Sequence, residues 1–423
     1  MAIVRPFRAL HYDPAVAGPL AAVVAPPYDV IGREEQDRLY DTSPYNVVRL
    51  DLSRDRDRYG SASRAFAAWR EEGALVRDPE PAFHVYAQRY RLKDGEERER
   101  FGFFTRLRLE EFASGKVLPH EKTLASAKAD RLELQRACRA NLSSIFAIYS
   151  AADFALADAT SSTRRAPWAD FTDPAGIRHR VWRLADREIQ RELANRLEDR
   201  VVYIADGHHR YETALRYRDE MRERTGRRDG DQPFDYVLAF LVNMEEPGLV
   251  VLPTHRLIRE LPIGAETLIE RLGARFRIEE SSRSARDLLE NLRPRTASER
   301  RIGLALRDRS FVLVTRDGEN DSYLTGSTAL RRLDVTLLHG LVLEGPASIL
   351  GLDAHREAEA GRLVYSKDEE EAVGRVESGE FAAAFLPNPT RISELRQVSE
   401  AGETMPEKST YFYPKILTGL VFN

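Results

Sequence analysis

Residues 201–215, VVYIADGHHRYETAL, constrain the fold of this chain more than any other stretch. Five apolar and aromatic residues, typical of a strand buried on both faces, run directly into Asp206 and Gly207. These two suit a sharp turn, because glycine tolerates a positive φ. A 3.6-residue spacing from Tyr211 onward predicts a helix that starts near His208. A buried strand that feeds a helix through a tight turn predicts an α/β fold.

Strands and helices alternate through the rest of the chain. Before the opening stretch, the patterns predict helices at 34–40, 61–75, 127–140 and 186–200, and strands at 45–52, 83–92, 100–109, 145–149 and 178–185. The strands at 83–92 and 100–109 flank a glycine-containing turn and predict a hairpin.

The length of 423 residues exceeds the size to which single hydrophobic cores usually grow, so we expect two domains. The polar stretch GRRDGDQP predicts a linker, which divides the chain into residues 1–230 and 231–423. The second part is predicted to be mixed α/β. Its elements are adjacent strands at 234–244 and 248–258, a hairpin at 302–318 and a strand–helix–strand unit at 361–389.

Composition excludes several classes of protein. No apolar run is long enough to span a bilayer, and the N-terminus does not resemble a signal peptide. The single cysteine, Cys138, excludes an internal disulfide framework and a cysteine-based zinc site, so we expect a cytoplasmic protein. A net charge of −4 makes nucleic acid an unexpected partner.

The turn after the buried strand has the composition of an anion site. The first N–H groups of a helix are unpaired and its dipole is positive there, so Arg210, His208 and His209 predict a phosphate site. A bare phosphate would repel Asp206, which we therefore expect to bind a metal ion or to orient a histidine. The alternative is that Asp206 caps the helix and the histidines are ordinary surface residues.

The sequence HEKT at 120–123 is a second candidate site. Glu121 stands between His120 and Lys122, an arrangement suited to general-base catalysis or metal binding, and lysine suits phosphate. The alternative interpretation is a solvated run of charges on a loop.

Two further stretches carry polar groups in suggestive places. In VVAPPYDVI, two prolines stiffen the chain before Tyr28 and Asp29, which predicts either a binding loop or a plain structural turn. Near the C-terminus, the candidates for phosphate contacts are Lys408, Ser409, Thr410 and Lys415. Lysine is rare here, with seven among 64 basic residues, and two of the seven lie at 408–415. For the aromatic residues at 411–413, packing is favoured over stacking on a base.

The common nucleotide-binding and hydrolytic motifs are missing from the sequence. It contains no GxxxxGK[ST] loop, no GxGxxG fingerprint after a strand, no HExxH and no GxSxG. A nucleotide would therefore be held by a different phosphate-binding turn.

The motif ADGHHR after a buried strand resembles the phosphate-binding turn of the ParB/sulfiredoxin superfamily, which includes nucleotide-hydrolysing ParB proteins, sulfiredoxin and free serine kinases. The chain is more similar still to a bacterial family long catalogued only as a domain of unknown function. The similarity extends over essentially the whole chain, and the motifs that carry it are APPYDVI (25–31), PYNVVRLDL (44–52), HEKT (120–123), RANLSSIF (139–146), YIADGHHRYETAL (203–215) and MPEKSTYFYPKILTGL (405–420).

The resemblance implies a ParB/sulfiredoxin-like nucleotide-binding core and an ATP-dependent kinase that phosphorylates free L-serine. It implies Mg²⁺ bound through Asp206, with Tyr28 and Asp29 at the substrate. The implied catalytic residues are Glu121, His120 and Asp206. The implied phosphate-binding residues are Gly207, His208, His209, Arg210, Lys122, Thr123, Lys408, Ser409 and Thr410.

Sulfiredoxin activity does not fit, because histidines occupy the region of its reactive cysteine. Two alternatives stay open. One is a ParB-like protein that hydrolyses or senses a nucleotide. The other is a metal-dependent hydrolase with His120, Glu121, His208 and His209 as ligands. A homodimer is a further expectation.

Overall fold

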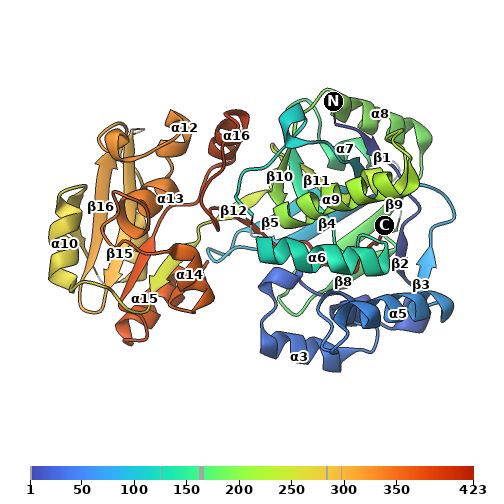
Figure 1. The fold of residues 1–423 in the computed structure, drawn as a ribbon, viewed down its shortest axis with the longest axis horizontal. Coiled ribbons are helices and arrows are strands. Elements are labelled where there is room, and N and C mark those ends of the chain that lie inside the picture. The colour runs from blue at the N-terminus through green and yellow to red at the C-terminus, as the bar shows by residue number, and fades with distance from the viewer. Residues whose placement is uncertain (1, 124, 162–165, 283, 297) are drawn as a thin grey trace. The chain divides into compact units, whose positions relative to one another are not determined.

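The computed structural model describes residues 2–123, 125–161, 166–282, 284–296 and 298–423 (Figure 1). The protein is mixed α/β, as predicted. It divides into two compact units. Unit 1 comprises Met1–Pro119, Thr123–Val250 and Pro414–Asn423, and unit 2 comprises His120–Lys122 and Val251–Tyr413.

This division differs from the expected one at residue 230. The polar stretch at 226–233 is only the connection from a helix to strand β11 (Tyr236–Asn243), which lies inside the main sheet of unit 1. Two short segments also cross between the units along the chain. Residues 120–122 belong to unit 2 although their neighbours in sequence belong to unit 1, and residues 414–423 return to unit 1 after unit 2. Composition marks polar connections, but it does not show which sheet the next strand joins.

Unit 1 is built on a nine-stranded sheet. Its order is β6 (Val117–Leu118), β10 (Val202–Asp206), β7 (Ile145–Tyr149), β11, β5 (Glu97–Arg108), β4 (Phe83–Arg91), β9 (Arg178–Leu184) and β8 (Ala169–Thr172), with β1 (Val4–Arg5) also paired to β5. The pairs β10–β6 and β11–β7 are parallel, and the other pairs are antiparallel. The predicted hairpin is confirmed in β4 and β5, where Arg91 lies opposite Glu97. Strands β2 (Leu10–Tyr12) and β3 (Leu75–Arg77) form a separate pair.

Helices surround this sheet. They are α1 (Pro14–Ala17), α2 (Leu20–Val23), α3 (Arg33–Thr42), α4 (Val48–Asp51), α5 (Arg58–Glu71), α6 (Ala125–Cys138), α7 (Leu156–Ala159), α8 (Arg187–Glu198) and α9 (His208–Thr225). The four helices predicted before the opening stretch are confirmed as α3, α5, α6 and α8. Helices α6 and α9 pack side by side (Figure 1).

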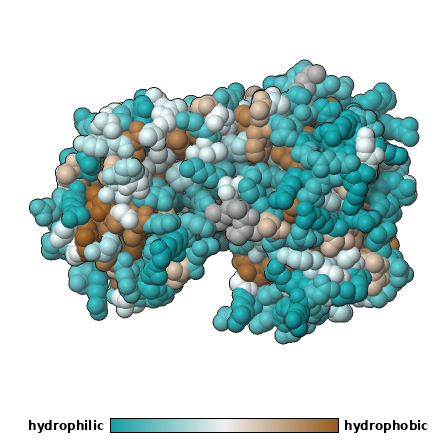
Figure 2. Space-filling view, viewed as in Figure 1, coloured by the Kyte–Doolittle hydropathy of each residue, from teal (hydrophilic) through white to brown (hydrophobic). Residues whose placement is uncertain are grey.

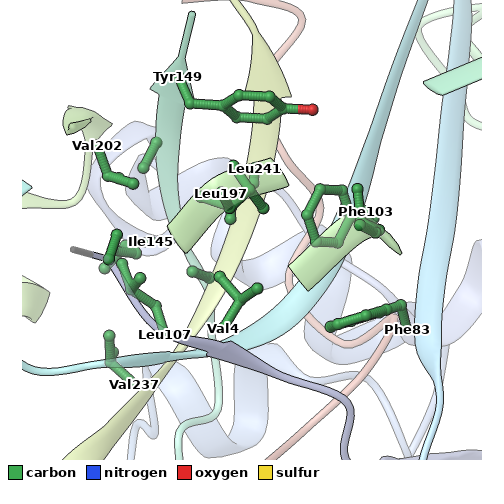
Figure 3. Close-up of a cluster of buried hydrophobic side chains, with 14 of the residues drawn as sticks. Val4, Phe83, Phe103, Leu107, Ile145, Tyr149, Leu197, Val202, Val237 and Leu241 are labelled. Atoms are coloured by element: carbon green, nitrogen blue, oxygen red, sulfur yellow. The ribbon is translucent and has the colours of Figure 1, made fainter. Parts of the chain in front are cut away.

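The core of unit 1 lies on one face of the sheet, as Figure 3 shows in close-up. Alternate residues of the strands, such as Phe103 and Leu107 of β5, pack there against Leu197 of α8 and Tyr211 of α9. The opposite face carries an aromatic group that includes Phe104, Phe146 and Phe240. Both faces of the central strands are therefore covered.

Residues 45–52, predicted to be a strand, instead contain helix α4, so that prediction was wrong. The cause is Asn46, whose side chain is buried. Its Nδ2 donates to the carbonyl oxygens of Ala22 and Val24, and its Oδ1 accepts from the N–H of Val48 at 3.0 Å. These side-chain bonds start a helical turn and override the β-branched composition of the segment.

Unit 2 has a six-stranded antiparallel sheet. Its order is β14 (Arg277–Ser281), β16 (Ser310–Arg316), β15 (Glu299–Leu306), β18 (Ala383–Leu386), β13 (His255–Ile258) and β17 (Leu363–Ser366). The hairpin at 302–318 and the strand–helix–strand unit at 361–389 are confirmed. The strands at 234–244 and 248–258 are not adjacent, because β11 belongs to unit 1 and β13 to this sheet. Strands β12 (Val250–Leu252) and β19 (Tyr411–Tyr413) form a separate pair.

Helices pack on both faces of the unit 2 sheet. One core contains residues of α10 (Ala265–Gly273), α13 (Asp334–Leu337), the π-helix Leu338–Leu343 and α14 (Ala354–Glu359). The other contains residues of α11 (Ala285–Asn291) and α15 (Glu369–Glu377). The remaining helices are α12 (Thr328–Arg331) and α16 (Ile392–Glu400). Hydrophilic residues cover most of the unit 1 surface visible in Figure 2. Among the described residues, no helix is both long and apolar enough to cross a membrane.

Candidate phosphate-binding site

The predicted strand–turn–helix is present, and its turn depends on Gly207. This residue has φ 89° and ψ 31°, in the left-handed region, between β10 and the 18-residue helix α9. The positive φ favours glycine, and a Cβ at this position would lie 2.9 Å from both Nε and Nη2 of Arg210, so the guanidinium would have to shift. No side-chain cap hydrogen bond closes the N-terminus of α9 within the described chain. The positive end of the helix dipole therefore lies at the turn.

Asp206, the last residue of β10, binds two cations. Its Oδ2 accepts a hydrogen bond from Nη2 of Arg210 at 2.7 Å, and its Oδ1 accepts one from Nζ of Lys415. Burial alone would raise the pKa of Asp206, but the charges of Lys415 and Arg210 hold that pKa well below its usual range. The turn therefore contains one carboxylate and two cations. Both of its oxygens accept hydrogen bonds from cations, and the predicted roles of Asp206, binding a metal ion or orienting a histidine, stay predictions.

The backbone around Lys415 is fixed by the aromatic face of the unit 1 sheet. Nε2 of Gln88 donates to the carbonyl oxygen of Lys415 at 3.0 Å, and Nη2 of Arg100 donates to that of Pro414 at 2.6 Å. Arg100 is fully buried, with its guanidinium 5.0 Å above the ring of Phe146. Sequence reasoning missed Gln88 and Arg100. The available signal was a charged and an amide side chain on strands that are otherwise buried.

The two histidines of the turn differ in environment. His208 is buried, with 6% of its surface exposed, and its charge contributes to the lowered pKa of Asp206. His209 is half-buried. His208 thus lies beside the carboxylate, inside the protein rather than on its surface.

A second charged cluster, which the sequence did not predict, lies near Arg210. Nη1 of Arg131 donates to Oδ1 of the buried Asp51 at 2.6 Å, and its Nη2 donates to the carbonyl oxygen of the same residue at 3.1 Å. The guanidinium of Arg131 also lies 4.1 Å above the ring of Tyr28. Burial raises the pKa of Tyr28 to about 12, opposed by the charges of Arg210 and Arg131. Tyr28 therefore belongs to this cluster, whereas Asp29 is exposed.

A small cavity of about 40 Å³ lies against this cluster, and Asp51, Arg131 and Arg210 all line it. Two atoms of the lining residues, Oδ2 of Asp51 and Nε of Arg210, are buried and have no hydrogen-bond partner among the described residues.

In unit 2, the HEKT motif meets the C-terminal KST motif. Oε1 of Glu121 accepts hydrogen bonds from the backbone N–H groups of Ser409 and Thr410, both at 3.0 Å, and from the hydroxyl of Thr410 at 3.2 Å. The buried His120 places its Nε2 2.8 Å from the same hydroxyl. The hydroxyl of Ser409 donates to the carbonyl oxygen of Pro406 at 2.6 Å, so this side chain stabilises the turn itself.

This arrangement fixes an unusual backbone conformation at Lys408. Its φ of 57° is left-handed, which costs a lysine roughly 1–2 kcal/mol. Glu121 holds the two residues that follow Lys408, and the buried Arg256 donates a hydrogen bond to the carbonyl oxygen of Lys408 at 3.1 Å. The side chains of Lys408 and Lys122 are both exposed. The strained turn thus presents Lys408 to solvent.

Thr123 is engaged by a carboxylate in unit 1. Its hydroxyl donates to Oε1 of Glu212, on α9, at 2.7 Å. Nζ of Lys128 binds Oε2 of the same glutamate at 2.7 Å. The predicted role of Thr123 at a phosphate stays a prediction.

The donor set does not fit a resident metal ion. Across the ranges that the structure describes, no group of three or more histidine, cysteine, aspartate or glutamate side chains is arranged to hold one. Both oxygens of Asp206 accept from cations. We therefore treat magnesium as part of a Mg-nucleotide substrate.

Comparison with known proteins places the chain in a family without giving it an activity. No curated protein matches it. It is similar to a solved structure of a conserved hypothetical protein from Pyrococcus furiosus, with 14% identity and a TM-score of 0.35 over 74% of this chain and 92% of that one. It is also similar to a free serine kinase in complex with AMP, with 12% identity and a TM-score of 0.36 over 74% of this chain and 86% of that one. The model of the family described as "Protein of unknown function (DUF1015)" matches residues 4–336, and the chain belongs to that family.

Proposed function

We propose that this protein is a kinase that transfers the γ-phosphoryl group of ATP to the hydroxyl of free L-serine, giving O-phosphoserine. One observation supports phosphate handling above all others. Two cations, Arg210 and Lys415, meet at Asp206 beside the left-handed Gly207 that opens an 18-residue helix. The choice of serine rests on the resemblance of the ADGHHR turn to that of free serine kinases.

Phosphoryl transfer depends mainly on positioning and on neutralising charge. The N–H groups of the first turn of α9 would bind phosphate oxygens, and Arg210 and Lys415 would stabilise the charge that develops on the transferred group. Asp206 holds both cations in place, so the site is organised before the nucleotide arrives. Magnesium, bound to the phosphates, would neutralise further charge.

The roles of the HEKT motif remain predictions. The resemblance predicts Glu121 as the base, with Lys122 and Lys408 neutralising charge. The hydrogen bonds of Glu121 support a role in holding the turn that presents Lys408.

The test is to incubate purified protein with Mg-ATP, with and without each amino acid, and to follow ADP and phosphoserine. We expect ADP formation that depends on serine. Arg210→Ala should reduce it by about 100-fold or more. Arg216→Ala, in an exposed position on the same helix, is the matched control and should leave the rate unchanged. ADP formation that is independent of serine would support the ParB-like nucleotide hydrolase instead.

A further inference from the structure

The small cavity beside Arg210 has two buried polar atoms without a partner among the described residues, Oδ2 of Asp51 and Nε of Arg210. Leaving a buried charged group unsatisfied costs at least about 1–3 kcal/mol, and native structures seldom tolerate it. Here one orphan is an acceptor and the other a donor, and both residues line the same cavity. A ligand that donates a hydrogen bond to the carboxylate and accepts one from the guanidinium would satisfy both atoms.

Each of these side chains is fixed by its other polar atoms. Oδ1 of Asp51 is held by Arg131 at 2.6 Å, and the Asp51 side chain is only 4% exposed. Nη1 of Arg210 donates to the carbonyl oxygen of Ser144, and its Nη2 donates to Asp206. Neither group can turn away to find another partner without breaking these bonds. Each side chain keeps one atom without a hydrogen-bond partner among the described residues, Oδ2 on the carboxylate and Nε on the guanidinium.

The chemistry of the two open positions selects a hydroxyl group. A phosphate oxygen could accept from Nε of Arg210 but would be repelled by the Asp51 carboxylate. An ammonium group could donate to Asp51 but would be repelled by the guanidinium. A hydroxyl donates its proton to the carboxylate and accepts from Nε through the same oxygen. The cavity, of about 40 Å³, has room for a group of this size.

We propose that Asp51 and Arg210 form the subsite for the acceptor hydroxyl, and that Asp51 is the general base for its phosphorylation. This inference rests on the proposed kinase function. Arg210 connects the subsite to the phosphate turn, because its Nη2 binds Asp206 and the residue also lines the cavity. A single guanidinium would thus contact both the attacking oxygen and the region of the transferred phosphate.

Oδ2 of Asp51 takes the proton of the acceptor hydroxyl as its oxygen forms a bond to the γ-phosphorus of ATP. The bond from that phosphorus to the β–γ bridging oxygen breaks, and ADP leaves with the electron pair. After the product dissociates, Asp51 releases the proton to solvent.

The surroundings of Asp51 suit a base. Burial raises the pKa of Asp51 and the charges of Arg131 and Arg210 lower it, with a net rise. The titratable and charged groups that act on it from neighbouring elements are Arg131 and Cys138 of α6, Arg210 of α9, and Tyr28 and Asp29 of the turn before α3.

The decisive variant is Asp51→Asn, which keeps the side-chain shape and an oxygen that can accept from Arg131 but cannot take a proton. We expect kcat to fall by about 10²–10⁴-fold, the range for loss of a general base, with the affinity for ATP unchanged. The acidic limb of the wild-type kcat–pH profile should also disappear. Asp130→Asn is the matched control. Asp130 also pairs with Arg131, at a more exposed position, and does not line the cavity, so its kcat should stay within about threefold.

The possible failures are distinguishable. Wild-type protein without serine-dependent ADP formation would overturn the kinase function and this inference together. Wild-type activity combined with an active Asp51→Asn variant and an unchanged pH profile would overturn the inference alone. If the variant does not fold, a crystal structure of the wild type with serine and a non-hydrolysable ATP analogue decides. Serine Oγ between Asp51 and Arg210 supports the subsite, whereas a lone water there, with serine bound elsewhere, refutes it.

Discussion

Nζ of Lys415 donates a hydrogen bond to Oδ1 of Asp206, joining two residues that lie 209 positions apart in the sequence. The contact brings a C-terminal segment to the end of strand β10 of unit 1. It also supplies the phosphate turn with a second cation, which the ADGHHR motif itself does not contain. The first prediction concerns this bond.

Lys415→Met removes the charge and keeps the apolar stem. Because Arg210 still pairs with Asp206, we expect the free energy of unfolding to fall by about 1–3 kcal/mol. We expect kcat/KM for ATP to fall by about 100-fold, as for loss of one donor to a developing anion. Urea unfolding and steady-state kinetics measure the two effects. Lys367→Met, an exposed lysine of unit 2, is the control, and an equal loss of activity there would refute a specific role for Lys415.

Gly207→Ala should be damaging for two separable reasons. The left-handed φ costs alanine about 1–2 kcal/mol, and the new Cβ would also press on the guanidinium of Arg210. Gly226, at the other end of α9, has φ 70° and open space around a Cβ, so Gly226→Ala carries the strain without the contact. We expect both variants to lose stability in urea unfolding and only the first to lose nucleotide affinity. Equal affinities would show that the turn does not position Arg210 for a phosphate.

Glu121→Gln and Glu121→Ala together distinguish a turn-holding residue from a base. Glutamine keeps an oxygen for the N–H groups of Ser409 and Thr410, whereas alanine removes it. If the residue holds the turn, we expect kcat of the glutamine variant to stay within about tenfold of wild type and the alanine variant to unfold about 2–3 kcal/mol more easily. A loss of about 1,000-fold in kcat with glutamine alone would identify Glu121 as the base.

Glu246 makes the stability of unit 1 depend on pH. Burial raises the pKa of Glu246 to about 7, and the N–H of Phe101 donates to its Oε1 at 3.2 Å. Since its folded pKa lies above its unfolded one, the stability it contributes is present below about pH 4.5 and is lost as the pH rises through about 7. Glu246→Gln should therefore raise the Tm at pH 8 and leave it unchanged at pH 4.5. Thermal unfolding of Glu245→Gln, its exposed neighbour, provides the comparison, and an equal rise there would refute the assignment.

The local parts of the fold were predictable from sequence because they depend on neighbouring residues. The period of the apolar residues predicted α3, α5, α6 and α8, and the sequence from Val202 to Tyr211 predicted the strand, the left-handed glycine and the helix. Residues 45–52 failed because a buried Asn46 binds backbone groups more than twenty positions away, which no local pattern records.

The site was only partly predictable for the same physical reason. The motif around Gly207 is contiguous, but the partners of Asp206 and Arg210 come from other parts of the chain. Asp51 stood inside a segment predicted to be a strand, and Arg131 inside an ordinary helix, so neither pattern suggested a buried ion pair. The burial of this ion pair and the lack of a hydrogen-bond partner for Oδ2 of Asp51 among the described residues depend on the three-dimensional structure, so no sequence pattern records them.

The discontinuity of unit 1 has a consequence for synthesis on the ribosome. Residues 414–423 are translated after all of unit 2, yet they belong to unit 1 and include the lysine that binds Asp206. More than 160 residues of unit 2 are therefore synthesised before residues 414–423 can dock onto unit 1. The contacts of unit 1 that span this sequence separation form late in folding. A chain terminated by a stop codon before residue 414 would lack Lys415 and therefore this cation. The order of translation thus couples the charge balance of the turn to synthesis of the residues that follow unit 2.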